Sequence, residues 1–321
     1  MPAILSGGAA NSLEMLEVEF DAFREETASS FEPYLDDSPM GEGEGDIKKY
    51  LVTGGHSLPI ENYNPDLHAD RVGSYAYQIG PISHGNGVKL HDDTWSDARY
   101  KEALVQAGEM GRSAGRLDDQ RIVARLTETT TGLLHQWDGV PVLSAAHNYG
   151  SATLQPGAPA PSYTTNQTNI YTGSGIGNPG AINTDLYAVM AGMDNLRNDK
   201  GIKFGTPAAA EIICFYPSAN GPLRQVLEAA FNPISMAGDD TTRQGWQHKV
   251  KLVGVTDLTN DNDYYYLRRP RGGASGLRRV NRQSITHQAY RDPKLRMNYW
   301  DYVYRNNFVF PGWRFWAKVN N

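Results

Sequence analysis

Apolar residues recur every three or four positions near the start of the chain, at Leu13, Leu16, Phe20 and Phe23, and acidic residues fill most of the positions between them. This spacing is typical of an amphipathic α-helix with one apolar face, and Ser12 is a suitable N-cap for it. We therefore expect an acidic helix whose apolar stripe lies against another surface.

The segment that follows, residues 38–46, reads SPMGEGEGD and alternates glycine with glutamate. It is too polar and too rich in glycine to pack, so it predicts a flexible joint. The acidic helix is then an arm on a hinge. The surface that receives this arm need not belong to the same chain.

Residues 57–93 predict an extended segment. Val72, Tyr75, Tyr77 and Ile79 form a β-rich run, and glycines and a proline interrupt the pattern before residues 88–90. A hairpin of this length is long for a connection inside a compact domain. We expect it to project from the domain and to reach a neighbouring molecule.

The longest helix is predicted from about residue 95 to residue 128, after a cap at Asp93–Thr94. Its apolar stripe is not a sustained heptad, which disfavours the alternative of a coiled coil. Gly108, Gly111 and Gly115 lie inside this helix, and each weakens it by up to about 1 kcal/mol relative to alanine. They predict a bend or a close crossing with another element.

The second half of the chain mixes helices and strands, which indicates an α+β fold. The C-terminal residues alternate aromatic with polar positions and predict strands packed into a core. A basic, glycine-rich stretch is expected to form a loop. The expected elements are a helix capped by Asn183–Asp185, a strand at 211–216, a helix opened by Pro217–Ser218, a strand at 250–255, the basic loop at 268–282, and aromatic strands at 299–316.

The composition is that of a folded protein, with 40% hydrophobic and 21% charged residues among 321. The 33 glycines and 18 prolines favour many turns over a helical bundle. No apolar run is long enough to cross a membrane, and residues 1–10 lack the pattern of a signal peptide. The single cysteine, Cys214, excludes an intrachain disulfide and is expected to be a small buried hydrophobic residue.

The net charge of −6 is unevenly distributed. Residues 1–50 contain twelve acidic and three basic residues, a net charge of −9, whereas residues 243–321 contain five acidic and fifteen basic residues, a net charge of +10. This asymmetry predicts electrostatic contacts between subunits, although two solvated faces that never meet would have the same composition. The candidate contact residues are Glu14, Glu17, Glu25, Glu26, Arg268, Arg269, Arg271, Arg278, Arg279 and Arg282.

Nucleic acid is a second candidate partner for the basic stretch at 268–282. Arginines neutralise phosphates without reading sequence, so this stretch could contact nucleic-acid phosphate. The acidic surface of the chain as a whole (sequence pI ≈ 5.8) favours pairing with the acidic arm of a neighbouring subunit instead.

Motifs for catalysis, cofactor binding or metal binding are weak in this sequence. The glycine-rich stretch at 173–177 does not join a strand to a helix as a dinucleotide fingerprint must. His91-Asp92-Asp93 could hold a metal, but an acidic helix start explains it, and Asp261–Asp263 lacks the remaining ligands of a calcium loop. We therefore expect that the protein is not an enzyme and binds no cofactor and no metal. The competing hypothesis is a hydrolase with a site near His147 or His91.

The order of these elements resembles the tailed-phage major capsid fold of the Hong Kong 97 type. More narrowly, the chain is similar to the Mu-like prophage major head subunit family. Three passages carry this resemblance: the helix at 100–126, the stretch WDGVPVLSAAHN at 137–148, and DLYAVMAGMDNLRNDKG at 185–201 followed by EIICFYP at 211–217.

The resemblance implies an N-terminal arm (1–56), an extended loop (57–93), a peripheral domain (94–180 and 285–321) with a long spine helix, and an axial domain (181–284). It also implies self-assembly through hexamers and pentamers into an icosahedral head shell enclosing double-stranded DNA, contacted non-specifically. Scaffolding, portal and decoration proteins would be further partners, with assembly in the bacterial cytoplasm and a final location in the virion. An encapsulin-like nanocompartment shell is the alternative function.

Overall fold

The computed structural model describes residues 7–40, 47–53, 74–93, 101–128, 137–152, 154, 156, 158–204, 211–231, 250–259, 261–269, 276–292 and 294–321. The chain separates into two compact units. The first comprises Met1–Lys48, Gly80–Ile122 and Arg279–Phe308, and the second comprises Lys49–Ile79, Val123–Arg278 and Val309–Asn321. Each unit therefore combines segments that are far apart in the sequence.

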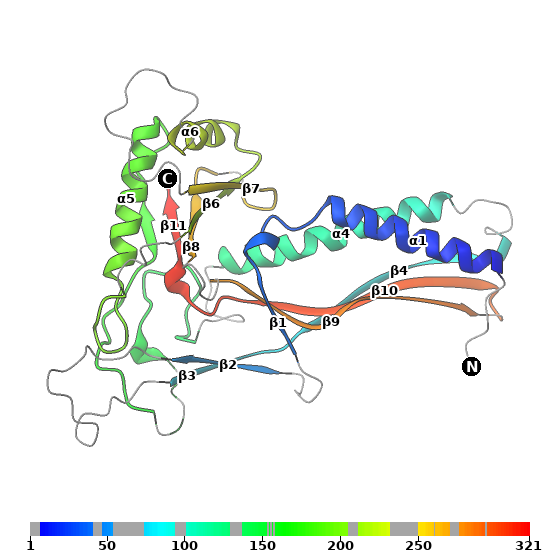
Figure 1. Cartoon of the computed structure of the whole chain (residues 1–321), viewed down its shortest axis with the longest axis horizontal. Helices are drawn as coiled ribbons and strands as arrows, with labels where there is room; N and C mark the ends of the chain where they lie inside the picture. The colour runs from blue at the N-terminus through cyan, green and yellow to red at the C-terminus, as the bar shows by residue number, and fades with distance from the viewer. Residues whose placement is uncertain are drawn as a thin grey trace. The chain divides into compact units, whose positions relative to one another are not determined.

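Two long helices and a four-stranded sheet make up most of the first unit. The helices α1 and α4 lie side by side along the sheet (Figure 1), whose strand order is β1-β9-β10-β4. β4 and β10 are antiparallel. The elements are α1 (Gly7–Glu26), the 3-10 turn η1 (Glu32–Tyr34), β1 (Asp36–Pro39), β4 (Ile82–His91), α4 (Lys101–Leu126), β9 (Arg278–Asp292) and β10 (Met297–Val309).

The core of the first unit lies between the helices and one face of this sheet. β10 alternates half-buried with buried residues, so Trp300, Tyr302 and Tyr304 all point to the same face. Leu16 and Phe20 of α1 pack against them and are buried. The apolar stripe of the acidic helix is therefore buried within its own chain, on a surface that its own β10 provides.

The glycines of α4 mark a close crossing with α1, one of the two alternatives predicted for them. A Cβ atom on Gly111 would lie 2.2 Å from the backbone oxygen of Phe20, and one on Gly115 would lie 2.7 Å from that of Thr27. A Cβ atom on Gly108 would meet the ring of Phe23. The absence of side chains at these positions lets the two backbones approach each other.

The predicted boundaries need correction at several places. α1 begins at Gly7, so Ser12 lies inside the helix and is not its N-cap. Most of the predicted hinge and the predicted cap at Thr94 lie outside the described residues, but Ser38 and Pro39 belong to β1. The ends of the predicted basic loop are strands, because hydrogen bonding to neighbouring strands places Arg268 in β8 (Tyr264–Arg269) and residues 278–282 in β9.

The strands of the predicted extended segment belong to two sheets. β2 (Lys48–Thr53) and β3 (Ser74–Ile79) pair with each other in a two-stranded sheet of the second unit. β4 instead pairs with β10 over ten residues of the first unit. The paired strands that flank residues 54–73 thus begin earlier than position 57, and residues 54–73 themselves lie outside the described part of the chain.

The second unit is built on a five-stranded mixed sheet of order β5-β11-β8-β6-β7. β6 and β7 are parallel, as are β11 and β5, whereas β8 is antiparallel to both of its neighbours. The elements are η2 (Tyr149–Ser151), β5 (Ile170–Thr172), α5 (Pro179–Asn195), β6 (Glu211–Pro217), α6 (Gly221–Phe231), β7 (Val250–Val255), β8, η4 (Trp313–Phe315) and β11 (Trp316–Asn320).

Helices α5 and α6 pack on one face of this sheet. Their apolar residues form a single core cluster with Cys214, Tyr264 and Tyr266. Cys214 is fully buried as predicted, and burial raises the pKa of its thiol. The N-cap of α5 lies five to seven residues earlier than the sequence predicted, because Asn178 accepts a hydrogen bond from the N–H of Ala181 and acts as the N-cap in place of residues 183–185.

Candidate functional site

The predicted acidic contact residues all lie on α1. Glu14, Glu25 and Glu26 are exposed, and Glu17 is half-buried. Glu26 lies 3.8 Å from the guanidinium of Arg112 on α4, which also pairs with Glu109 at 2.6 Å. These carboxylates form a solvated acidic face of the first unit, with one weak contact to a basic residue of the same chain.

The predicted basic contact residues are not brought together in one place. Arg268 is buried in β8 and its Nη1 lies 2.6 Å from Asp194, while Arg269 at the end of β8 and Arg278 at the start of β9 are half-buried. Arg279 and Arg282 lie half-buried in β9 of the first unit. Arg271 lies outside the described residues. Arg268 and Arg279 have carboxylate partners within the chain.

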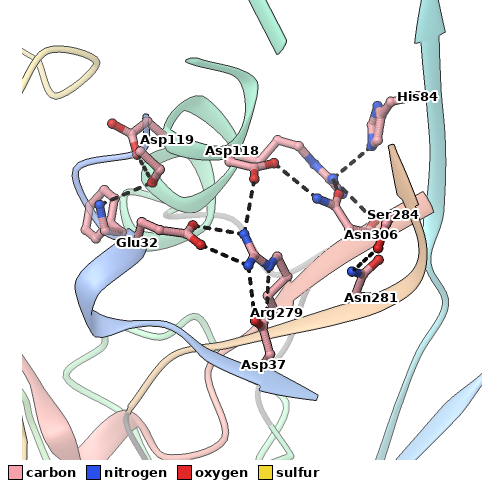
Figure 2. A network of polar contacts seen from close by, with 12 residues as sticks. Glu32, Asp37, His84, Asp118, Asp119, Arg279, Asn281, Ser284 and Asn306 are labelled. Atoms are coloured by element: carbon pink, nitrogen blue, oxygen red, sulfur yellow. Dashed lines mark hydrogen bonds and ion pairs between the residues drawn. The ribbon is translucent and has the colours of Figure 1, made fainter. Parts of the chain in front are cut away.

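Arg279 lies in a polar network of the first unit (Figure 2). Its Nη1 and Nη2 each donate to Glu32 of η1 at 2.9 Å, and its Nε donates to Asp37 of β1 at 2.7 Å. Asp118 of α4 lies 4.0 Å from Nη1. One guanidinium thereby contacts the segment after α1, strand β1 and the long helix α4.

The electrostatics of this network favour the charged form of Arg279. Burial alone lowers the pKa of this guanidinium, but the hydrogen bonds and charges of Asp37 and Glu32 outweigh that effect and raise it. Burial raises the pKa of Asp118, although Asn306, Arg279 and Arg121 act in the opposite direction. Bidentate arginine–carboxylate pairs are directional, so this contact fixes the register of the N-terminal segment on β9.

Asp119, the residue after Asp118 on α4, holds the turn that follows α1. Its carboxylate accepts hydrogen bonds from the hydroxyl of Ser29 and, at 3.1 Å, from the backbone N–H of Ser30. Charge-assisted hydrogen bonds of this kind are stronger than neutral ones. The end of α1 is therefore attached to α4 by polar contacts as well as by the glycine crossing.

A second arginine, Arg121, joins α4 to the sheet on the other side of Asp118. It donates to the side-chain oxygens of Asn306 and Asn307 at 2.8 and 2.9 Å, and its Nη1 lies 2.8 Å from Nε2 of His84. Because the guanidinium can only donate, Nε2 of His84 has to be an unprotonated acceptor. Burial and the charge of Arg121 both lower the pKa of His84.

A polar cavity of about 380 Å³ lies beside this network, within the first unit. Arg24 of α1, Asp118 of α4, Arg279 and Gln283 of β9 and Tyr304 of β10 are among its lining residues. Opposite charges are interspersed around it. The cavity therefore has no dominant charge that would select an anion or a cation.

The sequence pattern did not indicate the partners of Arg279. Glu32 and Asp37 contributed to the net charge of the first fifty residues, but nothing in their local pattern distinguishes them from the acidic residues of α1. The partners are 247 and 242 positions away from Arg279 in the sequence. A charge count could show that the two ends of the chain are complementary, but it could not show that they pair within one chain.

The two histidines of the hydrolase hypothesis have different surroundings. His147 is fully buried in the second unit, with Nδ1 2.7 Å from Asp138, Nε2 3.1 Å from the oxygen of Val142, and its ring stacked on Trp313. Both ring nitrogens face oxygens of the protein, so His147 has no free nitrogen for a substrate. His91 lies at the surface beside Asp93.

The described residues include no group of three or more His, Cys, Asp or Glu side chains that could hold a metal ion. In the same part of the chain, no helix combines the length and the apolar character needed to cross a membrane.

Comparisons with known proteins give a clear result for the fold. No family model matches the sequence, and no curated protein matches it. Solved structures do match along most of its length. The chain is similar to the crystal structure of a virus-like particle from Pyrococcus furiosus, with a TM-score of 0.56 and 10% identity over 96% of this chain and 98% of that chain.

Two phage structures give similar values. The mature capsid of bacteriophage PhiM1 matches with a TM-score of 0.55 and 12% identity over 90% of this chain and 86% of that chain. A structure of Microbacterium phage Oxtober96 matches with a TM-score of 0.54 and 12% identity over 91% of this chain and 90% of that chain. The chain has the predicted mixed α+β fold of the Hong Kong 97 type.

Proposed function

We propose that this protein is the major capsid protein of a tailed bacteriophage or prophage and assembles into the icosahedral head shell. The observation that supports the proposal is the match of nearly the whole chain to subunits of a virus-like particle and of phage particles. A shell subunit functions through contacts with its copies, so it needs no catalytic centre. We accordingly propose a structural protein rather than an enzyme.

The domain assignment follows from the same proposal. We infer that the first unit, with α4 as the spine helix, contains the core of the peripheral domain. We infer that the predicted axial domain at 181–284 contains α5, α6 and the strands β6, β7 and β8, and that β5 and β11, from the ranges predicted for the peripheral domain, complete its sheet. This domain would lie near the centre of a hexamer or pentamer. β2 precedes the predicted extended loop at 57–93, and β3 lies within it.

The finer parts of the assignment rest on the sequence resemblance. These parts are membership of the Mu-like prophage head subunit family, assembly in the bacterial cytoplasm, and scaffolding, portal and decoration proteins as partners. Double-stranded DNA would be enclosed and contacted without sequence preference. The arginines of residues 268–282 are candidates for contacts between subunits or with DNA, and two of them, Arg268 and Arg279, also pair with carboxylates of their own chain.

Electron microscopy of the purified protein tests the proposal directly. We expect closed shells, capsomers or tubes from the protein expressed alone or together with its scaffolding protein. Particles from an induced culture should protect double-stranded DNA from nuclease. A protein that stays monomeric under all these conditions would contradict a capsid function, and shells that hold a cargo enzyme in place of DNA would support a nanocompartment.

A further inference from the structure

The outer edge of β4 is an unprotected sheet edge in the first unit. The strand order places β4 last in the sheet, and it pairs with β10 without interruption from Ile82↔Asn306 to His91↔Met297. In the described part of the chain no other strand pairs with its far side. Natural sheets protect long edges with prolines, bulges or several charges, but β4 contains no proline, and Lys89 is its only Lys, Arg, Asp or Glu residue.

The backbone groups that face this edge can be identified from the register. Just beyond β4, the N–H of Asp92 donates to the oxygen of Arg296 at 2.8 Å, in line with the pairing of the strand. Backbone groups alternate in direction along an antiparallel strand, so even-numbered residues of β4 bond to β10 and odd-numbered residues face outwards. The N–H of Gly87 fits this assignment, because it donates to the side chain of Asn86 at 2.8 Å.

The outward-facing positions of β4 are also those whose side chains leave the core. Val88, at an even position, is buried beneath the helices, whereas Ser83, Gly85, Gly87 and Lys89 are exposed. Four alternate residues along the edge therefore direct their backbone N–H and C=O groups outwards, and among the described residues a side chain accepts a hydrogen bond only from the N–H of Gly87.

A groove follows the two glycines on the face of the sheet away from α1 and α4. Its volume is about 380 Å³, and Tyr290, Tyr299 and Val303 contribute to its lining next to Gly85 and Gly87. The rings of Tyr290 and Tyr299 stack at 4.7 Å with an angle of 6° between their planes, and form a rigid apolar wall. A strand glycine is often compensated by a large side chain on the neighbouring strand. In the described part of the chain, β4 has a neighbouring strand, β10, on one side only.

We propose that the outer edge of β4 binds an extended segment of a second copy of this chain, which adds a strand to the sheet and places a large side chain over Gly85 and Gly87. This inference rests on the proposed shell function, since each subunit of a shell is surrounded by its copies. Charge supports the choice of partner at Lys89, the only Lys, Arg, Asp or Glu residue of β4, because the chain has a net charge of −6 and its first fifty residues a net charge of −9. Asp301 of β10 also lines the groove, so this attraction applies to the strand edge and not to the groove. Main-chain hydrogen bonds supply affinity in such strand addition, and the side-chain groove supplies specificity.

Hydrogen exchange on the wild-type protein tests this inference without any substitution. The amides of Ser83, Gly85 and Lys89 should exchange at least about 100-fold more slowly in assembled shells than in free subunits, because an added strand protects them. The amides of even-numbered residues, which bond to β10 in both states, serve as the internal control. Shells with unchanged exchange at the three outward amides would overturn the inference while leaving the shell function intact.

Proline substitution gives an independent test. Lys89→Pro removes an outward N–H, so it blocks strand addition but leaves the ladder with β10 in place. We expect this variant to keep the circular dichroism spectrum of the free subunit and to lose at least about tenfold in shell yield, whereas Lys89→Ala assembles normally. Equal yields for both variants would contradict the inference. If Lys89→Pro does not fold, Ser83→Pro, with Ser83→Ala as its control, provides the same comparison at a second outward N–H.

The outcomes separate the two proposals. A wild-type protein that never assembles overturns both the shell function and the edge contact. Protection of the outward amides that appears only after another virion protein is added would overturn the second copy as the occupant of the edge.

Discussion

The crossing of α1 and α4 allows a prediction whose size and sign follow from the structure. Replacing Gly111 by alanine places a Cβ atom 2.2 Å from the backbone oxygen of Phe20 and 3.2 Å from the backbone nitrogen of Arg24. Real Cβ atoms do not approach other heavy atoms that closely, so the two helices have to separate. Because the obstacle is backbone, no change of side-chain rotamer can relieve it.

The magnitude is set by two opposing effects. Alanine inside a helix is favoured over glycine by about 1 kcal/mol. Overpacking a closely packed site costs about 1–3 kcal/mol, and the upper end applies where backbone has to move. The same shift loosens the packing of Phe20 against Trp300 and Tyr302, whose rings lie 5.7 and 4.5 Å from that of Phe20. We expect Gly111→Ala to lower the free energy of unfolding by about 1–2 kcal/mol.

Two matched variants separate the crossing from helix propensity. In Gly108→Ala the new atom meets the ring of Phe23, which can rotate, so we expect a change close to zero. In Gly221→Ala, at the start of α6, nothing lies within 4 Å of the new atom, so we expect a neutral or slightly stabilising effect. Urea titrations followed by circular dichroism give the free energies, and amide exchange along α4 localises the effect to the first unit. A Gly111→Ala variant as stable as the wild type would refute the close crossing.

Three further predictions concern the polar contacts of the first unit. Arg279→Met should lower the free energy of unfolding by about 1–3 kcal/mol in urea titrations, because it leaves the carboxylates of Glu32 and Asp37 without their partner; a smaller loss than in the control Lys89→Met would contradict this role. Because the pKa of His84 is lowered in the folded state, the contribution of the neutral imidazole to stability is present above the unfolded-state pKa near 6.5. It is lost as pH falls through the lower folded-state pKa. Thermal unfolding between pH 7.5 and pH 5 should therefore show a larger loss of stability in the wild type than in His84→Gln, and equal losses would contradict a pKa of His84 lowered by burial and by the charge of Arg121. The hydrogen bond from Arg291, with smaller contributions from Asn298 and Arg296, lowers the pKa of Asp92. The contribution of Asp92 to the free energy of unfolding is therefore present above about pH 4 and is lost as pH falls further. Asp92→Asn should lose less thermal stability than the wild type below pH 4, and an unchanged profile would contradict this.

Local pattern was enough to predict the kind of each main element. The spacing of Leu16 and Phe20 predicted a helix with a buried stripe, the apolar run around Cys214 predicted a buried strand, and the aromatic alternation near Trp300 predicted a core strand. All three are present. Periodicity determines which face of an element must be buried, because that requirement depends only on nearby residues. The ends of the elements were predicted less accurately. The N-cap of α5 at Asn178 depends on a single side-chain hydrogen bond, and the sequence pattern does not distinguish Asn178 from the other possible caps at 183–185.

The tertiary structure alone decided where those faces lie. The sequence showed that the stripe of α1 needs a surface, but only the fold places that surface on β10 of the same chain. It showed complementary charge at the two ends, but only the fold pairs Arg279 with Glu32 across 247 positions. The glycines of α4 indicated a bend or a close approach, and the partner helix decided between them. The physical reason is the same in each case: burial and charge create a local need for a partner, while the identity of the partner depends on chain segments that only folding brings together.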